Sequence, residues 1–274
     1  MEPVPQNSAM FEATSEPRPD SEPIVYEQPL NERMRAFMRL EFLWQQLSYH
    51  AGLPNAWSSR AAVSGLLEIL AITSRGDARG DVLKELERQM TVLRDYQNRP
   101  GVDAARLRNV LSALLRRREE LNAAGANFMQ KLRESEFLNA IKHRSAIPGG
   151  TCEFDLPDFF HWLNLDPNTR ESDLAAWLAT IRPLCESVSE LLWITRENAR
   201  PTEELAAGGH FQIVFERDRP VQLLRITLAG AARLFPEVSG SHHRCSLRFL
   251  RWNNVHSRPV QASEDVSFVL ATCY

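Results

Sequence analysis

Residues 26–43, YEQPLNERMRAFMRLEFL, predict an amphipathic helix with an arginine face. Apolar residues recur with helical spacing at positions 30, 34, 37, 40, 44 and 47. Asn31 can cap this helix, because its side-chain oxygen can accept a hydrogen bond from a backbone N–H of the first turn. Arg35 and Arg39 stand four residues apart and therefore share one face. Two guanidinium groups on a packed helix suit a partner that carries carboxylates, although two solvated charges on an outer face would give the same pattern.

The composition is typical of a globular protein with a hydrophobic core. The chain has 274 residues, of which 43% are hydrophobic, and these values fit one large domain or two modest ones. No apolar run reaches the roughly 20 residues that a membrane span requires, and the N-terminus lacks the basic and apolar regions of a secretory signal. The 4 cysteines lie far apart without a Cys-x-x-Cys pair, which favours reduced thiols. We therefore expect a cytoplasmic protein without a membrane segment.

Charge is distributed unevenly along the chain. The formal net charge is −3, but the first 23 residues alone carry five acidic residues and one arginine. Residues 211–260 contain eight arginines against three acidic residues, so this segment is locally basic. The overall balance favours neither a nucleic-acid binder nor a protein that attracts acidic substrates through its net charge.

Composition and periodicity divide the chain into three segments. Residues 1–23 hold five prolines among polar and acidic residues and predict a disordered tail. Residues 24–200 predict a mainly helical domain, with short strands near 24–27 and 151–154 that can join the sheet. Residues 201–274 predict a β-strand domain, because the hydrophobic period there changes from 3.6 to 2. The predicted layout is α+β, an N-terminal helical domain followed by a C-terminal antiparallel β-strand domain.

Several details of the helical part are also predicted. A helix over residues 127–144 should be interrupted near Ser135. Residues 147–150, IPGG, predict a turn. Residues 174–181 and 184–192 predict two successive helices, since each has its own apolar stripe.

In the last part of the chain, alternating residues predict the strands. Residues 211–215 should return through a turn at 217–220 to a second strand at 221–228. Two further strands are expected around residues 245–249 and 266–270. Such runs with short polar turns indicate an antiparallel sheet with one covered face.

Some short motifs carry a family resemblance. In chain order they are Pro29-Leu30-Asn31-Glu32, Arg39-Leu40-Glu41-Phe42-Leu43, Leu83-Lys84-Glu85-Leu86, Pro100-Gly101-Val102-Asp103, Ile147-Pro148-Gly149-Gly150 and Phe154-Asp155-Leu156-Pro157. With them, the chain from about Val25 to Cys273 resembles the ZapD (Z-ring-associated protein D) family of bacterial cell-division factors.

The resemblance implies a symmetric homodimer that binds the C-terminal tail of the tubulin-like GTPase FtsZ and cross-links FtsZ filaments at the division site. That tail is a short peptide with acidic and apolar residues. The family positions tied to this binding are basic, and they correspond here to Arg39 and Arg244. Arg35 is added as the helical neighbour of Arg39.

At two positions the chain departs from the family pattern. Glu136 stands where the family has an arginine, and Arg133 lies about one turn earlier in the sequence. Phe160 stands where the family has a histidine, and His161 is adjacent to it. We therefore include Arg133 and His161 among the residues expected to bind the FtsZ tail.

Zinc binding, nucleophilic catalysis and nucleotide binding each require particular residues, and ordinary structural roles explain the candidates better. His242, His243 and Cys245 could bind zinc, but a closed zinc site needs four ligands, so we expect no metal. Cys152 could be a hydrolase nucleophile, but no local signature surrounds it and a small buried thiol is common on a strand. The chain also lacks the glycine-rich motifs that hold nucleotide phosphates. We expect no catalytic residue, no enzyme activity and no cofactor.

The densest charge run is Arg116-Arg117-Arg118-Glu119-Glu120. It predicts a solvated helix face on which opposite charges stabilise one another. A nucleic-acid binder would carry basic residues interleaved with exposed aromatics or on a recognisable module, so we expect no nucleic-acid partner. The competing interpretation is a non-catalytic, arginine-rich adaptor that binds nucleic acid or peptides.

Overall fold

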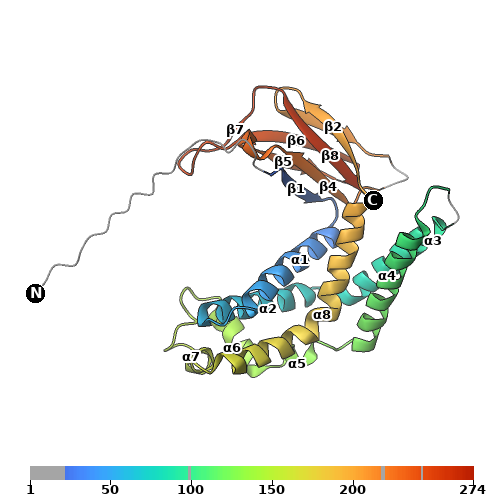
Figure 1. The fold of residues 1–274 in the computed structure, drawn as a ribbon. Coiled ribbons are helices and arrows are strands. Elements are labelled where there is room, and N and C mark those ends of the chain that lie inside the picture. The colour runs from blue at the N-terminus through green and yellow to red at the C-terminus, as the bar shows by residue number, and fades with distance from the viewer. Residues whose placement is uncertain (1–21, 98–99, 217–219, 242) are drawn as a thin grey trace, which may run out of the picture. The chain divides into compact units, whose positions relative to one another are not determined.

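The computed structural model describes residues 22–97, 100–216, 220–241 and 243–274. Two compact units are present, and each is described by itself. The helical unit comprises Pro29–Ala199 with Cys273–Tyr274, and the strand unit comprises the described residues up to Gln28 with Arg200–Thr272. Helices come first along the chain and antiparallel strands last, which confirms the predicted α+β class (Figure 1).

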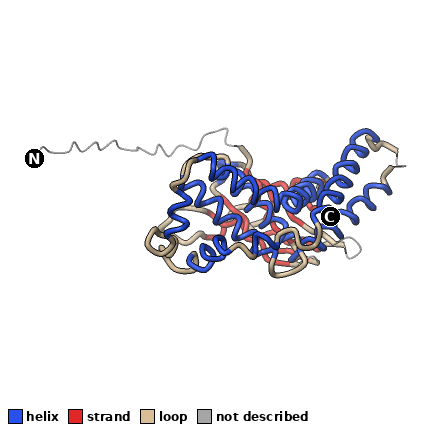
Figure 2. Tube along the Cα trace, turned by 90° about the horizontal axis from the view of Figure 1, so that it is seen from below, coloured by secondary structure: helices blue, strands red, loops and turns tan. Residues whose placement is uncertain are grey.

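The elements have the following bounds, and Figure 2 colours the helices blue and the strands red. The helices are α1 (Glu32–Ala51), α2 (Ala56–Thr73), α3 (Ala78–Asp95), α4 (Ala104–Ala124), α5 (Gln130–Arg133), α6 (Glu136–Arg144), α7 (Pro157–Leu163) and α8 (Pro167–Glu197). The strands are β1 (Ile24–Pro29), β2 (Arg200–Ala206), β3 (His210–Val214), β4 (Leu223–Leu228), β5 (Leu234–Gly240), β6 (Arg244–Arg251), β7 (Val260–Gln261) and β8 (Val266–Cys273).

Helix α1 begins and packs as its sequence predicts. The side-chain oxygen of Asn31 accepts a hydrogen bond from the backbone N–H of Met34 at 2.8 Å, which confirms the cap. The helix lies along α2 and α8 (Figure 1). Burying this apolar face fixes the rotation of α1 about its own axis. The residues on the buried face are Met34, Phe37, Leu40, Glu41, Leu43, Trp44 and Leu47.

A bidentate ion pair joins α1 to α8. The Arg196 guanidinium donates to both carboxylate oxygens of Glu41, at 2.8 and 2.7 Å. Both side chains are largely buried, with exposed fractions of 22% for Arg196 and 11% for Glu41. Parallel N–H···O bonds of this kind fix geometry as well as adding energy, so the pair sets the register of the two helices.

Helix α8 corrects one prediction. We expected two helices separated near Pro183, but the structure has one helix of 31 residues with this proline inside it. A proline in a helix interior removes a backbone hydrogen bond and costs about 3 kcal/mol. The buried stripe nevertheless continues across the proline through Ile181, Leu184, Cys185 and Val188, and its packing against the neighbouring helices offsets that cost.

The segment between α5 and α7 confirms two predictions and corrects one. Ser135 does interrupt the helix, because its hydroxyl caps α6 by accepting from the N–H of Leu138. Residues 147–150 form the expected turn. Residues 151–154 also form turns instead of the predicted strand. Cys152 bonds locally on both sides, because its N–H donates to the Gly149 carbonyl and its carbonyl accepts from the Leu156 N–H, each at 3.0 Å, which is the pattern of turns and not of a strand.

The strand unit contains two sheets where one was predicted. One has the strand order β1-β4-β8-β2, and the other has the order β3-β6-β5 with β7 also paired to β6. The aromatic rings of Phe249 and Phe268 lie 4.8 Å apart between centroids and pack across the two sheets. The early strand at residues 24–27 is present as β1 and joins a sheet, as predicted.

The predicted hairpin from β3 to β4 is wrong, because these strands belong to different sheets. Residues 217–219 of its turn lie outside the described residues. The sequence interpretation also missed β2 and β5. Strand β2 pairs antiparallel with β8, but its own residues are mostly polar and exposed, so its sequence lacks an alternating apolar signal. In the described ranges, every helix is too short or too polar to cross a lipid bilayer.

Glu41→Gln should destabilise the protein by about 1.5–3 kcal/mol, because a charge-assisted bidentate pair is lost and a largely buried arginine loses its counter-charge. Urea unfolding followed by circular dichroism measures the change. Glu68→Gln, at an exposed position of α2, is the matched control and should change stability by less than about 0.5 kcal/mol. Equal unfolding midpoints for the two variants would contradict the role given to the pair.

Candidate functional site

Two arginines, Arg35 and Arg39, lie on the outer face of α1. Arg39 is exposed, and no hydrogen bond or ion pair to it occurs within the described residues. Arg35 is half-exposed, and its nearest carboxylate oxygen, on Glu32, is 3.8 Å away. The Nε–H of Arg35 is buried and has no acceptor among the described residues. Arg39 therefore keeps its donors free at the surface, and the half-exposed Arg35 can offer its terminal guanidinium nitrogens, as carboxylate recognition requires.

Other arginines close to this face are already paired. Arg33, two residues before Arg35, reaches the buried carboxylate of Glu85 at 3.0 Å. Glu85 also accepts from Arg88 on α3 at 2.7 Å. Arg33 therefore ties α1 to α3, and its charge is compensated inside the helical unit. The contrast with Arg35 and Arg39 separates structural arginines from those that remain available.

The structure places Arg133 and His161 on other helices. Arg133 ends α5 and donates to the backbone carbonyl of Thr73, the last residue of α2, at 3.1 Å. This bond engages part of its guanidinium in the fold. His161 lies on α7 and is exposed. No hydrogen bond or ion pair among the described residues joins either of them to the arginines of α1.

Arg244 belongs to the strand unit and begins β6. Its side chain is exposed. Gly240 precedes it in the tight connection from β5, where a Cβ would lie 2.4 Å from the Arg244 carbonyl oxygen, so a larger residue would displace this turn. Arg244 is therefore held on an ordered strand and is considered separately from the arginines of α1.

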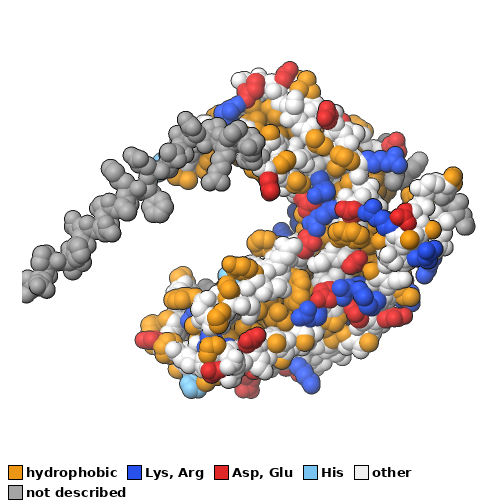
Figure 3. All heavy atoms as spheres, in the orientation of Figure 1, with side chains coloured by type: hydrophobic (Ala, Val, Ile, Leu, Met, Phe, Trp, Pro, Cys, Tyr) orange, Lys and Arg blue, Asp and Glu red, His pale blue; other side chains and the backbone are white. Residues whose placement is uncertain are grey.

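The arginine run on α4 is paired with opposite charges as its sequence predicts, but the predicted solvated face is wrong for Arg117, whose side chain is only 18% exposed. Arg117 contacts Glu120 at 3.0 Å and Glu186 of α8 at 2.5 Å. Arg118 lies 3.8 Å from Glu87 of α3. On the visible face of the helical unit, basic and acidic side chains lie next to one another (Figure 3). Such pairing leaves little free positive charge for a phosphate backbone.

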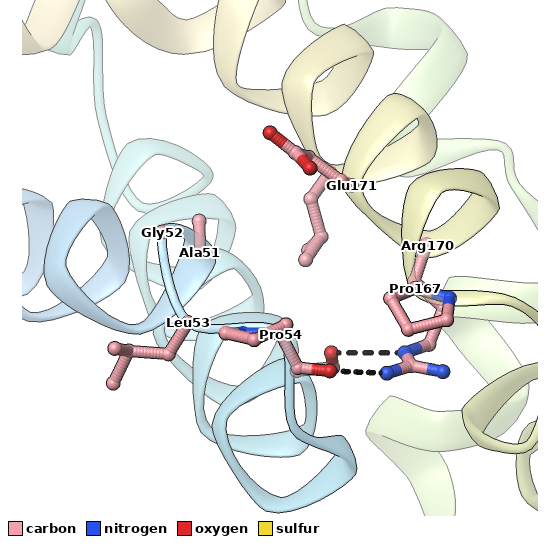
Figure 4. Close-up of a pocket in the computed structure, with 9 residues that line it drawn as sticks. Ala51, Gly52, Leu53, Pro54, Pro167, Arg170 and Glu171 are labelled. Atoms are coloured by element: carbon pink, nitrogen blue, oxygen red, sulfur yellow. Dashed lines mark hydrogen bonds between the residues drawn. The ribbon is translucent and has the colours of Figure 1, made fainter.

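A small pocket lies between the α1–α2 connection and the start of α8 (Figure 4). Its volume is about 40 Å³, against several hundred for a typical small-molecule site. The buried Arg170 spans it, donating from its NH2 group to the Pro54 carbonyl at 2.6 Å and from Nε to the Ser59 hydroxyl at 3.3 Å. The pocket therefore has a structural role, because the Arg170 guanidinium in it hydrogen-bonds to a backbone carbonyl and a hydroxyl oxygen and so connects α8 to the α1–α2 region.

The cysteines have the properties of structural thiols. The Cys152 thiol donates to the Asp155 carboxylate at 3.5 Å, and no hydrogen bond from it to a histidine occurs in the described residues. Burial raises the pKa of Cys185 to about 12, and burial also raises the pKa of Cys245. A raised pKa disfavours the thiolate that a nucleophile or a metal ligand needs.

The metal ligands considered from the sequence do not assemble into a cluster in the described chain. There, no group of three or more His, Cys, Asp or Glu side chains could hold a metal ion. His242 lies outside the described residues, while His243 is exposed and Cys245 is buried. The Cys245 thiol donates to the Ser241 carbonyl at 3.4 Å, which already explains its orientation.

Two aromatic residues that the sequence interpretation did not select also lie on the outer face of α1. Phe42 is 65% exposed and Tyr49 is 68% exposed. A signal for them was present, because both fall out of phase with the buried apolar stripe and in phase with Arg35 and Arg39.

The family model and the relatives found by comparison with known proteins carry the same description. A family model described as "ZapD: Cell division protein" matches residues 38–248. The cell division protein ZapD of Methylococcus capsulatus is 39% identical over 250 residues, covering 91% of this chain and 98% of the relative. Those of Aromatoleum aromaticum and Chromobacterium violaceum are each 35% identical, over 92% and 91% of this chain and 98% and 99% of the relatives.

Excess EDTA should leave the thermal unfolding midpoint unchanged, because no cluster of potential metal ligands occurs among the residues that the structure describes. Differential scanning calorimetry of the full chain with and without chelator measures this. A chelator-induced fall in the midpoint would contradict the prediction and identify His243 and Cys245 as ligands to test by substitution.

Proposed function

Because the chain belongs to the ZapD family of cell-division proteins, we propose that it binds the C-terminal tail of FtsZ and cross-links FtsZ filaments at the division site. In this proposal it is a cytoplasmic, non-catalytic factor without a cofactor. The single observation that supports tail binding most strongly is the arginine pair on the outer face of α1, where Arg39 is exposed without a partner among the described residues and Arg35 is paired only with Glu32, at 3.8 Å.

The chemistry of the arginine pair suits the tail. The FtsZ tail is a short peptide with acidic and apolar residues, as the family resemblance implies. Arg35 and Arg39 offer planar forks of donors that match carboxylate oxygens. Because α1 is fixed by its buried face and by Glu41, the arginine backbones are already ordered before the peptide arrives. Pre-organisation of this kind lowers the entropic cost of binding.

Arg133, His161 and Arg244 are proposed as further contacts to the tail. His161 and Arg244 have exposed side chains, which makes them accessible to a peptide. Arg133 has one guanidinium nitrogen engaged with Thr73, so it can contribute its remaining donors. Substituting each with alanine, alone and in the Arg39→Ala background, would identify which of them belong to one site.

Filament cross-linking requires at least two tail-binding sites in one particle. A two-fold homodimer duplicates every surface and is the simplest way for one chain to provide them. Several dimers that bridge the same two filaments add avidity beyond that of one contact. The proposal therefore includes a homodimer, and a single-chain mass by sedimentation equilibrium under bundling conditions would contradict it.

Arg39→Glu should weaken binding to an FtsZ tail peptide by about tenfold or more, equal to about 1.4 kcal/mol, since a donor is replaced by a carboxylate that repels the tail. Fluorescence anisotropy at low salt measures peptide binding, and co-pelleting with FtsZ filaments measures the full interaction. Arg94→Glu, an equal charge change at an exposed position of α3, is the matched control.

A duplex-DNA retention assay at the same salt decides between the proposed function and the nucleic-acid adaptor. We expect the wild-type protein to pellet with filaments and not to be retained on DNA. Retention on DNA without filament pelleting would favour the adaptor. Equal loss of tail binding in Arg39→Glu and Arg94→Glu would mean that only net charge matters and would remove the α1 site.

A further inference from the structure

Four side chains form a line along the outer face of α1. Arg35, Arg39, Phe42 and Tyr49 follow one another at steps of four, three and seven residues, which keeps them on one side of a helix with 3.6 residues per turn. We call these four residues the α1 ladder. The arginines occupy its N-terminal half and the aromatics its C-terminal half, so one strip of surface changes from cationic to apolar along its length.

The α1 ladder does not take part in core packing. The buried side chains of α1, such as Leu40 and Leu47 with 0% exposure, lie on the opposite side of the helix. Phe42 and Tyr49 by contrast leave about two-thirds of their surface in water. One exposed aromatic on a protein surface is ordinary, but two on the same side of a helix as two arginines make an amphipathic strip, in which Gln45 and Gln46 lie between the aromatics.

The charges of the ladder indicate what can occupy it. Arg39 has no ion-pair partner within the described chain, and the carboxylate nearest to Arg35 is that of Glu32, at 3.8 Å. A parallel second copy of the same strip would place arginine against arginine, and an antiparallel copy would place arginines against aromatics; neither supplies a carboxylate from the four ladder residues. A peptide with carboxylates followed by apolar side chains is complementary to both halves.

We infer that the α1 ladder is one continuous peptide-binding surface, in which Arg35 and Arg39 bind carboxylates and Phe42 and Tyr49 select an apolar side chain of the same peptide. This inference rests on the proposed function and extends its site to two aromatic residues. Aromatic rings are effective anchors because they bury large apolar areas with few rotatable bonds.

The helix geometry sets the spacing that the peptide must have. A rise of about 1.5 Å per residue places Phe42 about 4.5 Å and Tyr49 about 15 Å along the axis from Arg39. An extended peptide advances about 3.3 Å per residue. The selected apolar side chain therefore lies about one to five residues from the carboxylate, with the acidic end toward the N-terminus of α1.

The test uses the full chain and a fluorescent FtsZ tail peptide. Phe42→Ala and Tyr49→Ala should each weaken binding by about fivefold or more, as expected for interface anchors. Their affinity should keep the salt dependence of the wild type, because no charge has changed, whereas Arg39→Ala should reduce that dependence. Phe154→Ala is the matched control, since Phe154 is 83% exposed but lies outside α1.

A second peptide, with its apolar residues replaced by serine, makes the test specific. Phe42→Ala and wild type should bind this peptide with nearly equal affinity, because the contact that distinguishes them is gone. A large difference between them would show that Phe42 acts through the fold and would overturn the inference. Urea unfolding midpoints of all variants establish that folding is retained.

The remaining outcomes are distinguishable. If the peptide binds and depends on Arg39 but not on Phe42 or Tyr49, the inference is wrong while the proposed function stands. If wild type does not bind the tail peptide at all, the proposed function fails. If the aromatic variants bind peptide normally but sediment at a lower mass than wild type, the aromatics belong to an interface between copies, and the inference is overturned.

Discussion

The burial of one face of α1 against α2 and α8 is the constraint on which the account depends. Leu40 and Leu47 are fully buried, and Glu41 accepts two hydrogen bonds from Arg196. Together these contacts fix the rotation of the helix about its axis and its position along α8. Its opposite face is therefore presented to solvent in a fixed orientation. The hydrophobic core thus determines the side of the helix on which Arg35 and Arg39 lie.

Several other arginines of the helical unit form ion pairs that join one helix to another. Three arginines, Arg33, Arg117 and Arg196, each form an ion pair with a carboxylate from another helix. Their charges therefore stabilise the fold and are less available to an external partner. Arg170 is buried and satisfied by oxygens of the chain. Other arginines of the helical unit, such as Arg75, Arg94 and Arg108, are exposed as well. Basic and acidic side chains nevertheless lie next to one another on the visible face of this unit, which suits recognition of a short acidic peptide better than neutralisation of a long phosphate backbone.

The sequence predicted features that depend on local chemistry. The Asn31 cap, the break at Ser135 and the helical spacing of Arg35 and Arg39 are all fixed by residues within one or two turns of one another. The predictions failed where distant partners decide the structure. Pro183 is carried inside α8 by packing along its whole length, and residues 151–154 find local bonds but no partner strand.

The candidate site shows the same division between local and distant causes. Spacing alone placed two arginines on one face, but only the folded chain reveals that Arg39 has no partner among the described residues while Arg133 reaches Thr73, 60 residues away in sequence. Phe42 and Tyr49 could have been selected from the sequence, because apolar residues out of phase with a buried stripe must face solvent. Their extent of exposure, however, depends on which helices pack beside α1.

A charge-swap cycle between Arg39 and the carboxylates of the FtsZ tail tests the central claim most directly. Affinities are measured for wild type and Arg39→Glu, each against the native tail and against tails in which one acidic residue is replaced by arginine. The account predicts that one replacement restores much of the affinity lost in Arg39→Glu while weakening binding to wild type, because those two groups then meet with exchanged charges. A uniform response to every replacement, with no tail that recovers binding, would contradict the claim that α1 holds the tail at a defined site.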